Sequence, residues 1–198
     1  MLSNSRSGLV FVISAPAGTG KTTLVRLLCQ EFPEHICESV SCTTRAKRIN
    51  EQEGVDYYFL TPDQFDQKLK ENAFIEHATV FDHRYGTLRA EITDKTKQGR
   101  HVILVIDTQG AMNIKEHLQA VFIFIAPPSL EELERRLRLR QTETEQSLIK
   151  RLAWAKNEML MANSYDYVVV NEDLETAYEV LKSIVIAEEH RNRHKTVT

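Results

Sequence analysis

Residues 13–24 read I-S-A-P-A-G-T-G-K-T-T-L, at the end of the apolar run 9–14. The stretch matches the phosphate-loop pattern that joins a strand to a helix, with Ala15 where the strict pattern has glycine. If Ala15 has a negative φ, successive backbone N–H groups can face a phosphate at the helix N-terminus. Lys21 would reach the β- and γ-phosphates, and Thr22 would bind Mg²⁺. The predicted ATP-binding loop consists of Ala15, Pro16, Ala17, Gly18, Thr19, Gly20, Lys21, Thr22 and Thr23.

The alternative interpretation of this stretch is a glycine-rich turn that contains a lysine by chance. Strand, loop and helix patterns follow one another here in the order that the motif requires, which favours the phosphate loop.

The composition is that of an ordinary globular chain. Its 198 residues and hydrophobic fraction of 42% suit one domain with a sizeable core. A formal net charge of −3 argues against a general nucleic-acid binder, so any anion site must be local. The three cysteines form no C-x-x-C pair, which predicts reduced thiols in a cytoplasmic protein. The run 9–13 is too short to span a membrane, and we expect no membrane association.

Short apolar runs rich in β-branched residues alternate with amphipathic stretches. The runs are residues 9–14, 36–40, 101–106, 121–126 and 165–170. Continuous apolar strands are buried on both faces, which is typical of a parallel sheet. The alternation predicts an α/β fold, a P-loop NTPase core with a five-stranded parallel sheet flanked by helices.

Two segments interrupt this alternation. Residues 41–87 contain shorter strand-like pieces around one helix, and residues 135–151 contain five arginines. We interpret the first segment as an inserted β-rich subdomain and the second as a mobile helical lid. The single domain is then divided into a core (8–40, 88–134 and 152–198), the subdomain 41–87 and the lid 135–151.

Asp107 ends the apolar run 101–106, where a metal-side carboxylate is expected in a phosphate-loop protein. Such an aspartate can hold a water molecule of the Mg²⁺ shell, so Thr22 and Asp107 form the predicted metal site. Alternatively, Asp107 only caps the following helix.

D-T-Q-G at 107–110 resembles the D-x-x-G motif of GTPases. The chain has no N-K-x-D motif, so guanine is not recognised in the way that GTPases recognise it.

A second anion site is predicted from S-C-T-T-R-A-K-R at 41–48. Arg45 and Arg48 lie three residues apart after the second strand run, and strand ends of a parallel sheet converge on the ligand crevice. Two guanidinium groups there suit a phosphate clamp, with Tyr57 and Tyr85 as hydroxyl donors. The alternative is solvated surface charge.

Together with further motifs, these residues make the chain resemble the guanylate kinase family. The resemblance is carried by S-x-S-x-T-T-R-x-x-R (39–48), G-V-D-Y (54–57), F-I-E-H-A (74–78), Y-G-T (85–87), I-D-T-Q-G (106–110) and the residues 140–145, and it extends over about 9–190. It implies a GMP-binding subdomain, a lid over ATP, and the reaction ATP + GMP ⇌ ADP + GDP of purine nucleotide metabolism. It therefore implies ATP and GMP as partners and leaves monomer and homo-oligomer both open.

The resemblance also implies roles for single residues. The clamp on the GMP phosphate falls on Arg45, Arg48, Tyr57 and Tyr85. The guanine-reading positions fall on Ser41, Glu76 and Thr87. The catalytic cations are Lys21, Arg45 and the lid arginines Arg136, Arg140 and Arg151, and Asn171 falls near the adenine of ATP.

Chemistry supports the role of Glu76. Guanine presents N1–H and N2–H₂ side by side, two donors for one carboxylate, whereas adenine would leave a buried carboxylate unpaired. The alternative is that Glu76 is an exposed strand residue.

The chain departs from the family pattern at several positions. Val105 replaces a frequent acidic residue, Thr87 replaces serine, and Leu139 and Gln141 replace lid glycines. Two other classes of function remain: a catalytically inactive binding module, which typically lacks the loop lysine, and a phosphate-loop kinase for AMP, UMP or a sugar phosphate. Lys21, Thr22 and Asp107 argue against the first, and Ser41 with Glu76 argues against the second.

Overall fold

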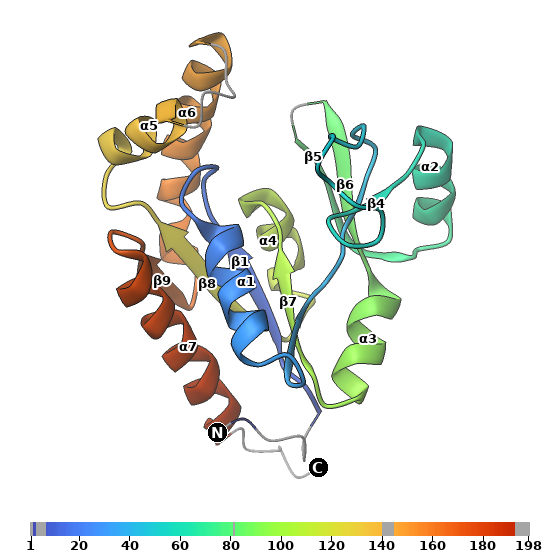
Figure 1. Cartoon of the computed structure of the whole chain (residues 1–198). Helices are drawn as coiled ribbons and strands as arrows, with labels where there is room; N and C mark the ends of the chain where they lie inside the picture. Colours follow the sequence, from blue (N-terminus) through green and yellow to red (C-terminus); the bar gives the residue numbers. More distant parts are fainter. Residues whose placement is uncertain (1, 3–6, 81, 140–144, 193–198) are drawn as a thin grey trace.

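The central element is a five-stranded parallel sheet in the order β2-β7-β1-β8-β9 (Figure 1). The computed structural model describes residues 2, 7–80, 82–139 and 145–192. The strands are β1 (Val10–Ser14), β2 (Ile36–Glu38), β7 (His101–Val105), β8 (Val121–Ala126) and β9 (Tyr167–Val170). They coincide with the five apolar runs, which confirms the predicted α/β core.

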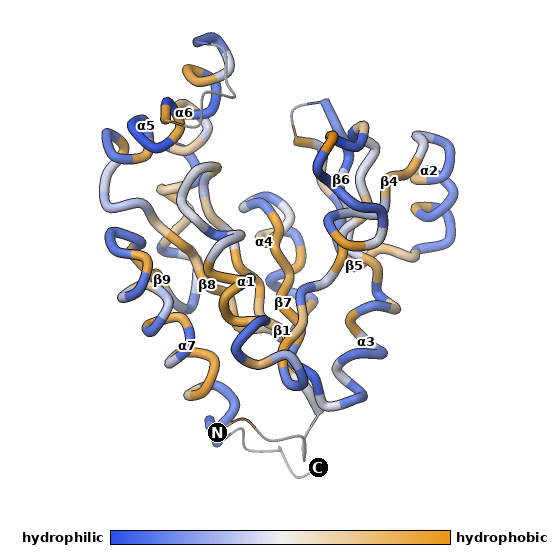
Figure 2. The backbone as a smooth tube through the Cα atoms, in the orientation of Figure 1, coloured by the Kyte–Doolittle hydropathy of each residue, from blue (hydrophilic) through white to orange (hydrophobic). Residues whose placement is uncertain are grey.

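Helices cover both faces of this sheet. Alternate residues of β1 point to opposite sides: Phe11 and Ile13 pack with α1 (Lys21–Glu31) and α7 (Leu174–His190). Val10 and Val12 pack with α3 (Arg89–Lys97) and α4 (Thr108–Lys115). Figure 2 shows hydrophobic residues along β1, β7 and β8 in the middle of the molecule. Burial on both faces explains why these strands are continuously apolar.

A second sheet lies beside the first and is four-stranded, in the order β4-β3-β6-β5. It consists of β3 (Cys42–Thr43), β4 (Tyr58–Phe59), β5 (Phe74–Val80) and β6 (His83–Leu88). Helix α2 (Pro62–Lys70) begins with a Thr61–Gln64 capping box and packs through Phe65, whose ring centroid lies 4.6 Å from that of Phe74 in a stacked pair. These elements extend from Cys42 to Leu88, and the division of the chain at 41–87 stays a prediction.

The arginine-rich segment belongs to two helices, α5 (Leu130–Leu139) and α6 (Glu145–Leu160). They contact each other through a small cluster formed by Leu133, Leu137, Leu148 and Ala155. These buried side chains give the arginine-rich helices a small core of their own. A 3₁₀ turn (Ala162–Ser164) follows α6.

No helix in the described ranges has the length and apolarity that a membrane span requires.

Candidate active site

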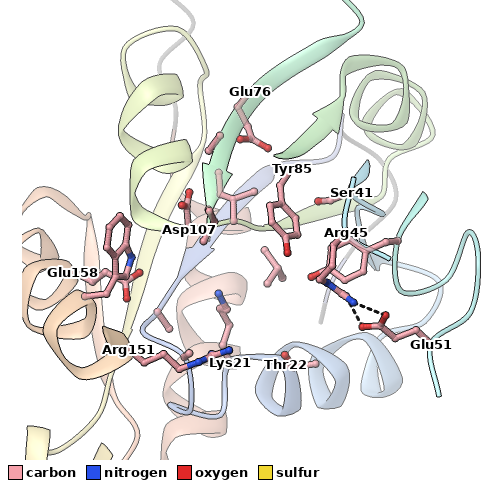
Figure 3. Close-up of a pocket in the computed structure, with 18 of the residues that line it drawn as sticks. Lys21, Thr22, Ser41, Arg45, Glu51, Glu76, Tyr85, Asp107, Arg151 and Glu158 are labelled. Carbon is pink, nitrogen blue, oxygen red and sulfur yellow. Dashed lines mark hydrogen bonds and ion pairs between the residues drawn. The ribbon is translucent and has the colours of Figure 1, made fainter. Parts of the chain in front are cut away.

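A cavity of about 350 Å³ lies between the carboxyl ends of the parallel strands and the second sheet (Figure 3). Its walls come from the loop after β1, the end of β7, the second sheet and α6. The lining residues include Lys21, Thr22, Ser41, Arg45, Arg48, Tyr57, Glu76, Tyr85, Asp107 and Arg151. The structure therefore brings most of the sequence-predicted site residues together.

The loop after β1 has the backbone that the phosphate-loop pattern requires. Gly18 and Gly20 adopt φ values of 95° and 90°, which favour glycine. Ala15 is not among the non-glycine residues with positive φ, as its substitution for glycine requires. Thr19 donates a hydrogen bond of 2.9 Å from its hydroxyl to the carbonyl of Pro16, which closes the turn.

The side chain of Asn171 contacts this loop. Its Nδ2 donates a hydrogen bond of 2.6 Å to the carbonyl of Thr19. A Cβ on Gly20 would lie 2.5 Å from the same Nδ2, so glycine is needed there for a second reason. Asn171 is buried, and a role at the adenine of ATP stays a prediction.

Lys21 projects into the cavity from the first turn of α1. Burial lowers the pKa of its ammonium group. The carboxylates of Glu158, Asp107 and Glu38 act in the opposite direction. The ammonium is thus partly desolvated among anions, a setting in which phosphate oxygens are favourable partners.

Asp107 does more than cap α4. Its Oδ1 accepts a hydrogen bond of 2.8 Å from the N–H of Gly110. Its Oδ2 is buried and has no hydrogen-bond partner among the described residues. Burial raises the pKa of this carboxyl group, against the effects of the Gly110 bond and of Lys21. An unsatisfied carboxylate oxygen in the same cavity as the Thr22 hydroxyl fits Mg²⁺, which prefers oxygen ligands and retains several waters.

Glu76 lies on β5 and is buried, with 6% of its surface exposed. This excludes the exposed-strand interpretation. The hydroxyl of Thr87 on β6 donates a hydrogen bond of 2.6 Å to its Oε1. Burial raises the pKa of Glu76 to about 7, despite this bond. Thr87 itself is fully buried, so it reaches the cavity through Glu76.

The predicted phosphate clamp lies across the cavity from Glu76. The guanidinium carbon of Arg45 is 5.4 Å from the ring centroid of Tyr57, and the Tyr57 and Tyr85 rings are 5.9 Å apart. Arg48 also lines the cavity. Arg45 forms a bidentate ion pair with Glu51. The two nitrogen–oxygen distances in this pair are 3.0 Å and 2.6 Å. The interpretation as solvated surface charge is therefore wrong for Arg45, whereas Arg48 is exposed.

The lid arginines differ in position. Arg151 lines the cavity. Arg136 is not among the residues that line this cavity; it donates to the backbone carbonyls of Asn171 and Glu172 and pairs with Glu132. Arg140 and Gln141 lie outside the described residues. Leu139, at the end of α5, is 66% exposed.

Sequence reasoning missed three residues that bring polar side-chain groups to the cavity wall: Glu51, Trp154 and Glu158. Trp154 and Glu158 lie three and seven residues after Arg151 on α6, so helical spacing from a predicted site residue could have found them. Glu158 is 6% exposed, and burial raises its pKa to about 7, against the charge of Lys21. The acidic residue three positions after Arg48 was the indication for Glu51.

Comparison with known proteins identifies the family. A family model described as guanylate kinase matches residues 7–188. The chain belongs to the guanylate kinase family. Guanylate kinases are phosphotransferases that act on ATP and GMP, so the resemblance read from the sequence is confirmed.

Individual guanylate kinases support this assignment over nearly the whole chain. A guanylate kinase of Protochlamydia amoebophila is 52% identical over 186 residues, 94% of each chain. The crystal structure of guanylate kinase from Anaplasma phagocytophilum superposes with a TM-score of 0.77 at 37% identity, covering 97% of this chain and 90% of the other. The SH3-kinase fragment of tight junction protein 3 shares the fold alone, with a TM-score of 0.53 at 13% identity over 96% of this chain and 61% of the other.

Proposed function

We propose that this chain transfers the γ-phosphoryl group of ATP to GMP, and also to dGMP, giving ADP and GDP. The observation that carries the proposal is one cavity whose walls contain both Lys21 of the phosphate loop and the buried carboxylate of Glu76. ATP would lie along the loop from Ala15 to Thr23, with Asn171 near the adenine. GMP would lie on the second sheet, and the reaction would take place in the cytoplasm.

Recognition of guanine is assigned to Glu76, with Ser41 and Thr87. A charged Glu76 accepts hydrogen bonds from N1–H and N2–H₂ of guanine, while Thr87 holds one of its oxygens. AMP offers no such pair of donors, so the buried carboxylate would be left unpaired. This arrangement favours GMP over the other nucleoside monophosphates.

The acceptor phosphate is assigned to Arg45, Arg48, Tyr57 and Tyr85. An oxygen of this phosphate is the nucleophile, and because it is already anionic, no general base is required. Catalysis then consists of positioning and charge neutralisation. Lys21 would contact the β- and γ-phosphates, and Arg136, Arg140 and Arg151 would neutralise the moving phosphoryl group.

Mg²⁺ bound with ATP belongs to the proposal. Thr22 would hold it directly and Asp107 through water, and it would neutralise charge on the phosphate oxygens. Val105, which lines the cavity in place of an acidic residue, leaves Asp107 as the carboxylate at this strand end.

A substrate panel tests the proposal. ADP formation from ATP would be measured with GMP, dGMP, AMP, UMP and CMP, and Lys21→Ala would serve as the control that ties turnover to the loop. We expect turnover with the two guanine nucleotides and near-complete loss in Lys21→Ala. Faster turnover with AMP or UMP than with GMP would contradict the assignment, as would a folded Lys21→Ala with the parent's rate.

A further inference from the structure

Arg45 and Glu51 form an ion pair inside the cavity (Figure 3). Nη2 of Arg45 lies 2.6 Å from Oε1 of Glu51, and Nη1 lies 3.0 Å from Oε2. The side chains are only 13% and 16% exposed. A bidentate and largely buried pair holds the guanidinium plane in one orientation.

The pair leaves one edge of the guanidinium for a phosphate. Nη1 donates to Glu51 and, at 2.9 Å, to the carbonyl of Ala46, while Nη2 gives one proton to Glu51. The remaining Nε proton and second Nη2 proton are parallel and lie along the other edge. Tyr85, a predicted clamp residue, lines the same cavity. One arginine can thus bind a carboxylate end-on and a phosphate side-on.

Glu51 is itself fixed by the backbone. Its Oε2 accepts a hydrogen bond of 2.9 Å from the N–H of Arg48. Its own N–H donates to the carbonyl of Arg48 at 3.2 Å. The carboxylate therefore closes the turn that carries Arg48 and at the same time anchors Arg45, so it connects both arginines of the predicted clamp.

We propose that Glu51 is a positioning residue for the acceptor phosphate: it stays paired with Arg45 when GMP binds and presents the Nε–Nη2 edge to the phosphate. This proposal rests on the proposed function, because it takes Arg45 as a ligand of the GMP phosphate. An arginine that is already ordered loses less side-chain entropy on binding.

In the opposite arrangement, Glu51 occupies the binding position of the GMP phosphate on Arg45 and has to be displaced when GMP binds. Its departure would remove three hydrogen bonds at once, two from Arg45 and one from the N–H of Arg48. A group held by the backbone turn itself is poorly suited to being displaced. The two arrangements predict opposite changes in the KM for GMP when the carboxylate is replaced.

The test replaces Glu51 with glutamine. The amide keeps the shape but turns an NH₂ group toward one nitrogen of the guanidinium, so the bidentate pair is lost. The KM for GMP is expected to rise about tenfold, the effect of one charge-assisted hydrogen bond. The KM for ATP should stay within about twofold, and kcat should change less than the KM for GMP, because the contact exists before the transition state.

Two further variants separate positioning from folding. Glu51→Asp keeps the charge and should lie between the parent and Glu51→Gln. Asp66→Asn is the matched control, since Asp66 pairs with Arg84 in the same subdomain but does not line the cavity. It should leave both KM values unchanged.

A double-mutant cycle with Arg45→Ala completes the test. The effect of Glu51→Gln should largely disappear in that background, because Glu51 acts through Arg45. The proposal is overturned by an unchanged or lower KM for GMP in both Glu51 variants, by equal rises for ATP and GMP, or by a full effect without Arg45. A parent protein that does not phosphorylate GMP would instead contradict the proposed function.

Discussion

Thr87 and Glu76 are register partners across the antiparallel β5–β6 pair, and the Thr87 hydroxyl donates a hydrogen bond of 2.6 Å to Glu76. Both side chains are buried, so the carboxylate is fixed in a place from which bulk water is largely excluded. A buried acceptor in that setting discriminates strongly between ligands that can donate to it and those that cannot.

Glu76→Gln should therefore lower kcat/KM for GMP by about 10²-fold or more, because an amide places a donor against a guanine donor. AMP and IMP should lose much less, which narrows the preference for GMP. Steady-state kinetics with the three nucleotides checks this. Thr87→Ser, which keeps the hydroxyl, is the matched control and should stay near the parent. An unchanged ratio of GMP to AMP in Glu76→Gln would move the guanine reader elsewhere.

The same carboxylate predicts a pH dependence. Burial raises the pKa of Glu76 to about 7 in the empty cavity, whereas binding guanine requires the charged form. GMP binding should therefore release a proton near neutral pH, and affinity should fall below pH 7 by up to about tenfold per unit. Calorimetry in buffers of different ionisation enthalpy measures the release. Fewer protons should be released when GMP binds to Glu76→Gln. An identical proton release in both proteins would assign the release to another group.

Substitution of Gly110 should affect GMP binding without lowering the stability of the fold. A Cβ at this position would lie 2.8 Å from Oε2 of Glu76 and 3.1 Å from Oδ1 of Asp107. Gly110→Ala should raise helix propensity in α4, yet push the Glu76 carboxylate out of place. We expect unchanged or higher thermal stability together with an increase of about tenfold in the KM for GMP. Loss of stability with an unchanged KM would show that Glu76 adapts to the added methyl group.

Motion is predicted for the helices that carry the arginines. Arg138 of α5 pairs with Glu134 and with Glu145 of α6, and Arg151 and Trp154 of α6 face the cavity. Closure of segment 135–151 over bound nucleotides should slow its amide hydrogen exchange when a bisubstrate analogue is added. Exchange that is equally slow without ligand would indicate a rigid helical pair instead of a lid.

The parts of the fold that depend on local sequence were predictable. The continuous apolar pattern of β1 follows from burial on both faces, and the phosphate loop follows from glycines whose backbone angles are left-handed. The Thr61 capping box is likewise set by residues three positions apart. In each case the physical cause lies within a few residues of its effect.

The contacts that shape the cavity are of another kind. Glu51 was missed because its role depends on how a turn folds back onto Arg45. Helical spacing from Arg151 could have pointed to Glu158, but its proximity to Lys21, more than a hundred positions away in the chain, depends on how α6 packs. The two buried leucines of the arginine-rich segment, Leu137 and Leu148, belong to different helices that pack against each other. Such pairings are set by tertiary packing, which residue patterns along the chain do not specify.

A crystal structure with an inert analogue that joins adenosine and guanosine through a pentaphosphate would test the assigned ATP and GMP sites most directly. We expect guanine N1 and N2 at about 2.7–3.2 Å from the Glu76 carboxylate oxygens. We also expect the guanosine-side phosphate on Arg45, and the adenosine-side phosphates along the loop that ends at Lys21. Guanine bound away from Glu76, or adenosine-side phosphates away from this loop, would contradict the assigned sites.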